Sequence, residues 1–428
     1  MGEPGDFQHF GPDGWNAAGA AARCRGWSVT GMPNLHSHAF QRAMAGLAER
    51  QTHPEDSFWT WRELMYRFAG RINPDSQYAV AAQLYAEMLE AGFTSVCEFH
   101  YLHHQPDGRP YDDHGAMSKA LVAAARDTGM RLSLLPVLYM TGGFDGRPLG
   151  ERQRRFGHSL QAYQSLIDDL RPLASDTLAI GVALHSLRAV PPGALQELLA
   201  WIGDAALPIH IHIAEQIGEV QECEALRGAR PVEWLLANAD VDRRWSLVHA
   251  THLNAAEVQG IAASGATVAI CPTTEANLGD GLFPLRDYLA AGGSWGIGSD
   301  SHVSVSPVEE LRWLEYGQRL VQRRRNIAVG AAVPSTGECL FGEALRGGLR
   351  ACGQAGAAAD TVVLDADAPA LAGARGDDLL DRLVFAGNRC LVRDVHVAGR
   401  QVVRDGRHLD RDRIARRYAD TLRALLAD

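Results

Sequence analysis

Histidine and aspartate side chains stand where apolar runs of this sequence end, an arrangement that could bind a metal ion. The first run ends in His36 and His38, and the single residue between them points both imidazoles to the same face of a strand. Imidazole nitrogens suit Zn²⁺, so this pair can share one ion. His212 and Asp300 end two later runs and complete a His₃Asp donor set. The sequence therefore predicts one Zn²⁺ per chain, although these donors also accept iron or manganese.

A second group of residues could transfer protons beside that ion. Glu215 comes three residues after His212, where a carboxylate can take a proton from water and pass it to a leaving nitrogen. A glutamate at a helix start is also favoured by the helix dipole alone, so a structural role stays open. His249 could bind the metal or carry a proton, because histidine titrates near neutral pH. The predicted catalytic residues are Glu215, His249 and Asp300.

These side chains are far apart in the sequence and need a fold that gathers them. Apolar, strand-like runs alternate with helix-like segments, which is typical of a parallel sheet covered on both faces. Eight such runs predict an α/β fold, a TIM-like (β/α)₈ barrel whose strands end at one mouth. The runs are Thr30–Leu35, Phe93–Phe99, Leu132–Tyr139, Ala179–Leu184, Pro208–Ile213, Ser246–Ala250, Ala266–Cys271 and Ser294–Gly298. An open doubly wound sheet is the alternative, but no Gly-x-Gly-x-x-Gly motif follows the first run.

The pattern changes after about residue 356, where short strands and turn signals replace the strand–helix alternation. We expect residues 28–356 to form the barrel and residues 357–428 to form most of a small β-sandwich-like domain. Residues 1–27, which are poor in strand signals, would supply a shortened N-terminal part of that domain. Its expected elements are strands at Thr361–Leu364, Leu383–Phe385, Cys390–Val397 and Gln401–Val403, and a helix at Asp410–Leu426.

The overall composition matches an ordinary soluble enzyme. The 428 residues are 46% hydrophobic and 21% charged, with a formal net charge of -10. This acidic balance argues against a nucleic-acid partner. No window approaches ~18 consecutive apolar residues, so we expect no membrane span. The seven cysteines form no Cys-x-x-Cys motif and the N-terminus shows no signal peptide, which favours a cytoplasmic location.

The order of these motifs resembles the amidohydrolase superfamily. The residues that carry the resemblance are His36 and His38 on the first strand, His212 on the fifth, His249 on the sixth and Asp300 on the eighth. The segment Val395–Arg407 is also similar to the end of that superfamily's small β domain. The resemblance implies that the His₃Asp set binds the metal, while Glu215 and His249 handle protons.

Within that superfamily, five segments are similar to the formimidoylglutamate deiminases. These segments are Gly31–Met44, Cys97–Tyr101, Leu184–Arg188, His210–Gln216 and Cys271–Phe283. The similarity implies zinc-dependent hydrolysis of N-formimino-L-glutamate to N-formyl-L-glutamate and ammonia, a step of histidine degradation, and it implies a homodimer. It also implies a substrate-binding set made of Gln41, Arg62, Tyr101, His185 and Arg188.

Two features of the residues agree with this resemblance. Superfamily members with two metals commonly bridge them through a lysine on the fourth strand, but the only lysine here, Lys119, lies in a helix-like segment. Arg62 and Arg188 suit a diacid substrate, because a guanidinium fork matches a carboxylate, although surface salt bridges would also explain them. Two other functions stay open: a superfamily deaminase that acts on a purine or pterin ring, and a metal-free barrel that only binds a partner.

Overall fold

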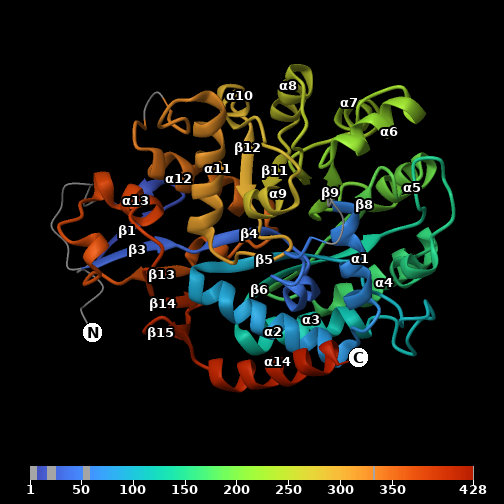
Figure 1. The fold of residues 1–428 in the computed structure, drawn as a ribbon, viewed down its shortest axis with the longest axis horizontal. Coiled ribbons are helices and arrows are strands. Elements are labelled where there is room, and N and C mark those ends of the chain that lie inside the picture. The colour runs from blue at the N-terminus through green and yellow to red at the C-terminus, as the bar shows by residue number, and fades with distance from the viewer. Residues whose placement is uncertain (1–6, 17–25, 52–57, 331–332, 428) are drawn as a thin grey trace.

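The computed structural model describes residues 7–16, 26–51, 58–330 and 333–427. Eight parallel strands close into a barrel (Figure 1), which confirms the predicted fold class. The strands are β4 (Met32–Ser37), β5 (Phe93–His100), β6 (Arg131–Leu138), β8 (Val182–Ser186), β9 (Ile209–Ile213), β10 (Trp245–His249), β11 (Thr267–Ile270) and β12 (Ser294–Ile297). The ring closes where Ile297 on β12 pairs with Asn34 on β4. Each predicted apolar run overlaps one of these strands, and the fourth run also overlaps the short strand β7 (Leu178–Ile180).

Helices between the strands cover the outside of the barrel (Figure 1). They are α1 (Phe58–Ala69), α2 (Pro74–Ala91), α3 (Ala116–Thr128), α4 (Leu160–Leu170), α5 (Pro192–Ile202), α6 (Ile217–Arg227), α7 (Pro231–Asn238), α8 (Ala255–Ser264), α9 (Pro272–Leu278), α10 (Leu285–Ala290), α11 (Pro307–Gln322) and α12 (Thr336–Ala351). Local sequence sets their ends. In α2, Asn73 accepts a hydrogen bond from the Ser76 N–H, Pro74 starts the helix, and Gly92 ends it with a φ of 101°.

A second sheet takes its strands from both ends of the chain, in the order β16-β15-β14-β13-β3-β1-β2. Its strands are β1 (Phe7–Gly11), β2 (Gly14–Trp15), β3 (Gly26–Thr30), β13 (Thr361–Leu364), β14 (Val392–Val397), β15 (Arg400–Arg404) and β16 (Arg407–His408). The N-terminal segment therefore contributes strands despite its weak strand signals. Parts of the predicted segment 1–27, residues 1–6 and 17–25, lie outside the described residues. The division of the chain into domains stays a prediction.

One expected strand of the small domain was wrong. Leu383–Phe385 is the last turn of helix α13 (Gly376–Phe385), not a strand. Leu379 and Leu380 are buried together with Leu383 and Val384, which is the spacing of a helix face and not of a strand. Three apolar residues read alone could not show this period.

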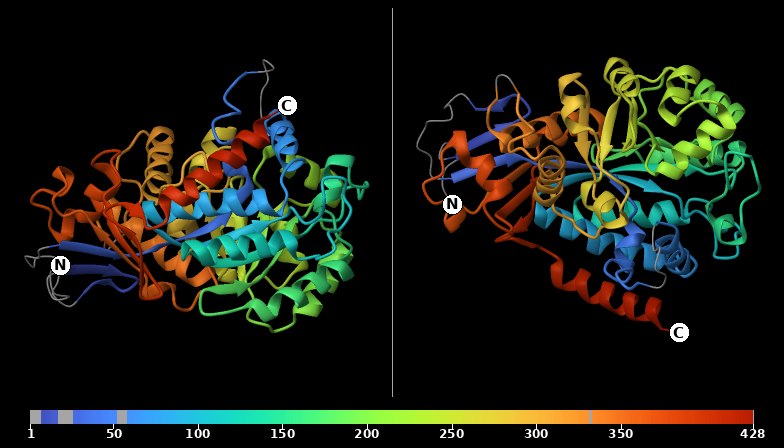
Figure 2. Two further views of the ribbon diagram at one scale, coloured as in Figure 1. Left: turned by 90° about the horizontal axis from the view of Figure 1, so that it is seen from below. Right: turned by 45° about the horizontal axis from the view of Figure 1, so that its top comes forward.

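The last helix, α14 (Arg411–Leu426), confirms the helix expected at the end of the chain. It runs from the small sheet back along the barrel beside α2 (Figure 2). The guanidinium of Arg71 stabilises the C-terminal end of α14 by donating a hydrogen bond to the Leu425 carbonyl at 2.8 Å. Among the described residues, no helix is long and apolar enough to cross a membrane.

Helix α12 lies so close to the barrel that its inner face needs glycine. A Cβ on Gly347 would stand 1.9 Å from the Trp295 carbonyl oxygen on β12. The neighbouring Gly348 faces Pro33 on β4 in the same way, at 3.1 Å. The glycines thus let α12 cover the point where the barrel closes between β12 and β4.

Candidate active site

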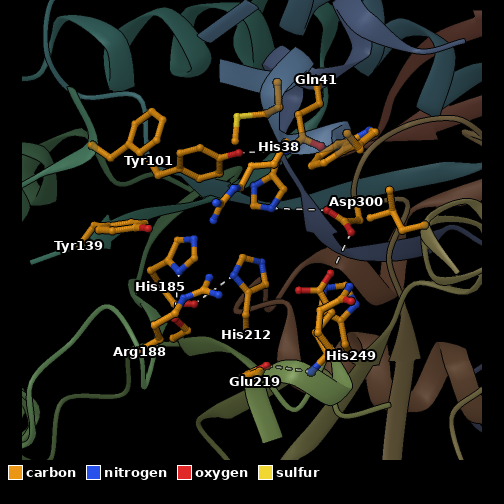
Figure 3. A pocket seen from close by; sticks show the side chains of 18 of the residues that line it. His38, Gln41, Tyr101, Tyr139, His185, Arg188, His212, Glu219, His249 and Asp300 are labelled. Atoms are coloured by element: carbon orange, nitrogen blue, oxygen red, sulfur yellow. Dashed lines mark hydrogen bonds and ion pairs between the residues drawn. The ribbon is translucent and has the colours of Figure 1, made fainter. Parts of the chain in front are cut away.

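The C-terminal ends of the strands gather the predicted metal donors, three of which, His38, His212 and Asp300, are labelled in Figure 3. His36 and His38 lie on or directly after β4, His212 lies on β9, and Asp300 follows β12. His36 Nε2 is 3.2 Å from His38 Nε2 and 3.0 Å from His212 Nε2. Asp300 Oδ1 is 3.5 Å from His36 Nε2 and 3.4 Å from His38 Nε2. All four side chains are buried.

These separations fit ligands around one small cation. Tetrahedral ligands at ~2.0–2.1 Å from an ion stand about 3.4 Å from one another. Burial lowers the pKa of His38 to about 3 and the pKa of His36 well below its ordinary value. The imidazoles are therefore neutral, and two bare ring nitrogens that face each other repel unless a cation lies between them. The described residues thus fit a single divalent ion.

Backbone carbonyls orient two of the imidazoles. His38 Nδ1 donates to the Phe99 carbonyl at 2.8 Å, and His212 Nδ1 donates to the His185 carbonyl at 3.0 Å. Each bond places the proton on Nδ1 and leaves Nε2 with a lone pair that points at the cluster. Metal-binding histidines are commonly held in this way.

A buried glutamate fixes the loop that carries His38. Glu98 on β5 accepts hydrogen bonds from Ser37 Oγ and from the Ala39 N–H, both at 2.6 Å. On the other side, a Cβ on Gly298 would stand 2.7 Å from the Cβ of His36, so only glycine lets β12 approach β4 this closely. The two contacts hold the His-x-His segment from both flanks.

His249 and Glu215 lie together beside the donor cluster. His249 Nε2 is 3.7 Å from Glu215 Oε1 and 3.8 Å from Asp300 Oδ2. Its Nδ1 is 3.3 Å from Glu275 Oε1. Burial alone would lower the pKa of His249, but the Glu215 carboxylate and hydrogen-bonding neighbours raise it well above its ordinary value. The arrangement can hold and move a proton at the edge of the cluster.

The backbone is strained where these residues sit. His249 has a φ of 67° and Asp300 a φ of 45°, and Ala214, just before Glu215, has a φ of 51°. Residues other than glycine rarely adopt this left-handed region, and such strain collects at functional sites. The strand ends are therefore bent to aim these side chains inward.

A pocket adjoins the cluster, and the five predicted substrate-binding residues all line it: Gln41, Arg62, Tyr101, His185 and Arg188. Gln41 Nε2 donates to the Tyr101 hydroxyl at 2.9 Å. Burial and the positive charges of Arg188 and Arg62 keep the pKa of His185 well below its ordinary value. Arg62 and Arg188 both line this pocket, so it can attract a ligand with more than one carboxylate.

Several pocket residues were missed from the sequence. Tyr66, Tyr139 and Phe156 form an aromatic wall, and Glu219, in the first turn of α6, also lines the pocket. No sequence signal marks Glu219, because Glu215 precedes α6 and only the fold brings the Glu219 carboxylate to the Glu215 N–H. The aromatic residues carry no signal either. The lone lysine, Lys119, binds Asp113 at 2.7 Å on the surface helix α3, away from the strand ends.

Comparisons with known proteins agree with this geometry. A sequence profile of the amidohydrolase family matches residues 29–347. The chain is 54% identical over 416 residues to the formimidoylglutamate deiminase of Pseudomonas aeruginosa. This alignment covers 96% of this chain and 92% of that protein. It is 26% identical over 383 residues to the 5-methylthioadenosine/S-adenosylhomocysteine deaminase of Natronomonas pharaonis, covering 88% of this chain and 81% of that protein.

A solved structure shows the same fold over nearly the whole length. The crystal structure of an amidohydrolase from Brucella melitensis superposes with a TM-score of 0.91 at 46% identity, covering 98% of each chain. An adenosine deaminase from Xanthomonas campestris, solved with bound zinc, shares the fold with a TM-score of 0.75 at 22% identity, covering 94% of this chain and 87% of that one. The family profile, the relatives and the strand-end donor cluster lead to one conclusion: this chain belongs to the amidohydrolase family and is a hydrolase.

Proposed function

We propose that this protein hydrolyses N-formimino-L-glutamate to N-formyl-L-glutamate and ammonia, as a step of histidine degradation. The observation that carries the proposal is the pocket, which is lined both by Arg62 and Arg188 and by members of the His₃Asp set. A substrate with two carboxylates and a hydrolysable imino carbon matches this pocket: the carboxylates suit the two arginines, and the imino carbon suits the His₃Asp cluster. The 54% identity to a formimidoylglutamate deiminase supports the same substrate.

His36, His38, His212 and Asp300 would hold one Zn²⁺ per chain, since three neutral imidazoles and one carboxylate suit this ion. Zinc bound by such a set supplies water that ionises near pH ~7. Glu215, whose Oε1 faces His249 Nε2 at 3.7 Å, would take the proton from the attacking water. It would then deliver that proton to the imino nitrogen. The hydroxyl group that adds to the carbon would give its own proton to the same nitrogen as the carbon–nitrogen bond breaks, so that ammonia leaves and the carbon keeps the water oxygen as a formyl group.

The remaining pocket residues would position the substrate. Each guanidinium fork can hold one carboxylate through two parallel hydrogen bonds. Neutral His185 and the Gln41–Tyr101 pair supply further polar contacts. His249 would stabilise the charge that develops at the reacting carbon. It would act through Nε2, because its Nδ1 faces Glu275. Together they would hold the imino carbon beside the activated water.

We also propose that the protein works in the cytoplasm. The cysteines within the described residues are all free thiols, and five of them are buried: Cys97, Cys223, Cys271, Cys339 and Cys352. A reducing compartment preserves such thiols.

The test is ammonia release by the zinc-loaded protein. N-formimino-L-glutamate should be the best substrate, N-formiminoglycine, which lacks the second carboxylate, should be much poorer, and adenosine and guanine should give no ammonia. The variant Glu215→Gln tests the proton-transfer role: it should keep its zinc and lose at least about 100-fold in kcat. Faster release from adenosine or guanine, or none from any substrate, would contradict the proposal.

A further inference from the structure

A second cavity lies where the small sheet meets the barrel. Its volume is about 350 Å³, and it shares no lining residue with the pocket at the barrel mouth. Its walls come from β3, β4, β13 and β14 and from helices α11, α12 and α13, which are labelled in Figure 1. Pockets that bind small organic ligands have volumes of roughly 300–1,000 Å³. The cavity is therefore large enough for such a ligand.

The interior of this cavity is apolar because one face of the small sheet is apolar. Val362 and Leu364 lie two residues apart on β13, and their side chains are buried on the same face of the sheet. Val29 pairs with Val362 from the neighbouring strand β3. Phe341 of α12 and Leu383 of α13 complete the apolar wall. An aromatic or aliphatic group of a ligand would be stabilised here by its removal from water.

Arg312, which lines the cavity from α11, has no charged partner to balance it. Its guanidinium donates hydrogen bonds to the Val384 carbonyl at 2.7 Å, to Asn388 Oδ1 at 2.8 Å and to the Gly387 carbonyl, all neutral groups. Within the described part of the chain, no carboxylate forms an ion pair with Arg312. A guanidinium has five N–H donors, so three hydrogen bonds leave capacity for a ligand oxygen.

A second arginine, Arg389, lies on the solvent side of the cavity. It is 74% exposed, and its guanidinium is 3.7 Å from the Asp365 carboxylate. A long and exposed ion pair contributes little, so this side chain can turn toward a ligand. Glu309 also lines the cavity, but it is exposed and accepts a hydrogen bond from Ser304 Oγ at 2.6 Å. Two arginines against one glutamate favour a ligand with a negative charge.

We propose that this cavity is a second ligand site, which binds a small organic anion with an apolar body, such as an aryl carboxylate. The apolar body lies against the wall of β13 and α12, and the carboxylate accepts hydrogen bonds from Arg312 and Arg389. An apolar pocket with a few polar groups is the common form of a small-molecule site. The two sites are lined by different residues, so the inference does not depend on the identity of the substrate.

The first test is calorimetric titration of the zinc-loaded protein with 4-phenylbutyrate. This probe should bind at least about 5-fold more tightly than 4-phenylbutanol, which lacks the charge, and than butyrate, which lacks the ring. Cys390 reports where the probe binds, because it lines the cavity and is exposed. At ten times the dissociation constant, its alkylation by iodoacetamide, followed by peptide mass spectrometry, should slow about 10-fold. Unchanged alkylation of Cys390, or equal affinity for 4-phenylbutanol, would overturn the proposal.

Variants of the lining residues test the same site. Val308→Phe fills part of the cavity and should weaken 4-phenylbutyrate binding at least about 10-fold, whereas Val321→Phe, at an exposed position of the same helix, should change it less than about 2-fold. Arg389→Gln should weaken binding about 3-fold or more, and the matched control Arg404→Gln, at an exposed position of β15, less than about 2-fold. Circular dichroism shows that each variant is folded.

A carboxylate probe could also bind in the catalytic pocket, so Arg188→Gln separates the two sites. This variant should bind 4-phenylbutyrate as wild type does, because Arg188 does not line the second cavity. Loss of binding in Arg188→Gln, or wild-type affinity in both Val308→Phe and Arg389→Gln, would overturn the proposal.

Discussion

Replacing Glu219 with glutamine is expected to remove a loss of stability that wild type suffers as the pH rises. Glu219 is 8% exposed, and its Oε2 accepts the Glu215 N–H at 3.0 Å. Its Oε1 is buried without a hydrogen-bond partner among the described residues. Burial, reinforced by the nearby charge of Glu215, raises the pKa of Glu219 to about 7. The substituted amide still offers an oxygen to the Glu215 N–H.

The size of the effect follows from that pKa. The rise from 4.5 to about 7 means that the folded protein binds this proton more tightly than the unfolded chain does. The stabilisation is therefore complete below pH 4.5 and is lost as the pH rises through about 7. At 1.36 kcal/mol per pKa unit the loss is about 3 kcal/mol by pH 8.5.

The assay is urea unfolding of metal-free protein at pH 5.0 and pH 8.5, so that no bound cation alters the field at Glu219. Glu219→Gln should gain up to about 3 kcal/mol relative to wild type between the two pH values. Glu197→Gln, on the exposed face of α5, is the matched control and should show no such gain. Equal pH dependence in wild type and Glu219→Gln would refute the reasoning.

Three further predictions concern substrate, packing and metal. Arg188→Lys should raise KM for N-formimino-L-glutamate about 10- to 100-fold, because lysine cannot form the two-point carboxylate contact, whereas Arg152→Lys at the exposed rim should change KM less than about 2-fold. Equal KM values would remove Arg188 from substrate binding. Gly347→Ala should lower the free energy of unfolding by about 2 kcal/mol or more in thermal unfolding, because its methyl would overlap the Trp295 carbonyl; unchanged stability would contradict the contact. Glu98→Gln should weaken zinc binding about 10- to 100-fold by titration against a chelator, since it loosens the loop of the first two donors; an unchanged affinity would remove Glu98 from the support of the site.

The barrel could be predicted because its strands are buried on both faces. Each strand appears in the sequence as an apolar run, and the polar residues that end the runs stand out against it. The clustering of His36, His38, His212 and Asp300 could be predicted for this reason. A strand end is a position that topology alone brings to the barrel mouth.

The rest depended on contacts that sequence order does not reveal. Strand β3 pairs with β13, which lies more than three hundred positions later, and β1 pairs in turn with β3. Glu275 is significant only because the chain turns back to place it 3.3 Å from His249. The aromatic pocket wall comes from separate segments, helix α1 for Tyr66 and the stretch after β6 for Tyr139 and Phe156, whose aromatic residues look like ordinary core.

The most direct measurement is zinc anomalous diffraction from a crystal of the zinc-loaded protein. One peak per chain is predicted, ~2.0–2.2 Å from the Nε2 atoms of His36, His38 and His212 and from a carboxylate oxygen of Asp300. A peak bound by other residues, two peaks at the barrel mouth, or no peak at the strand ends would contradict the account.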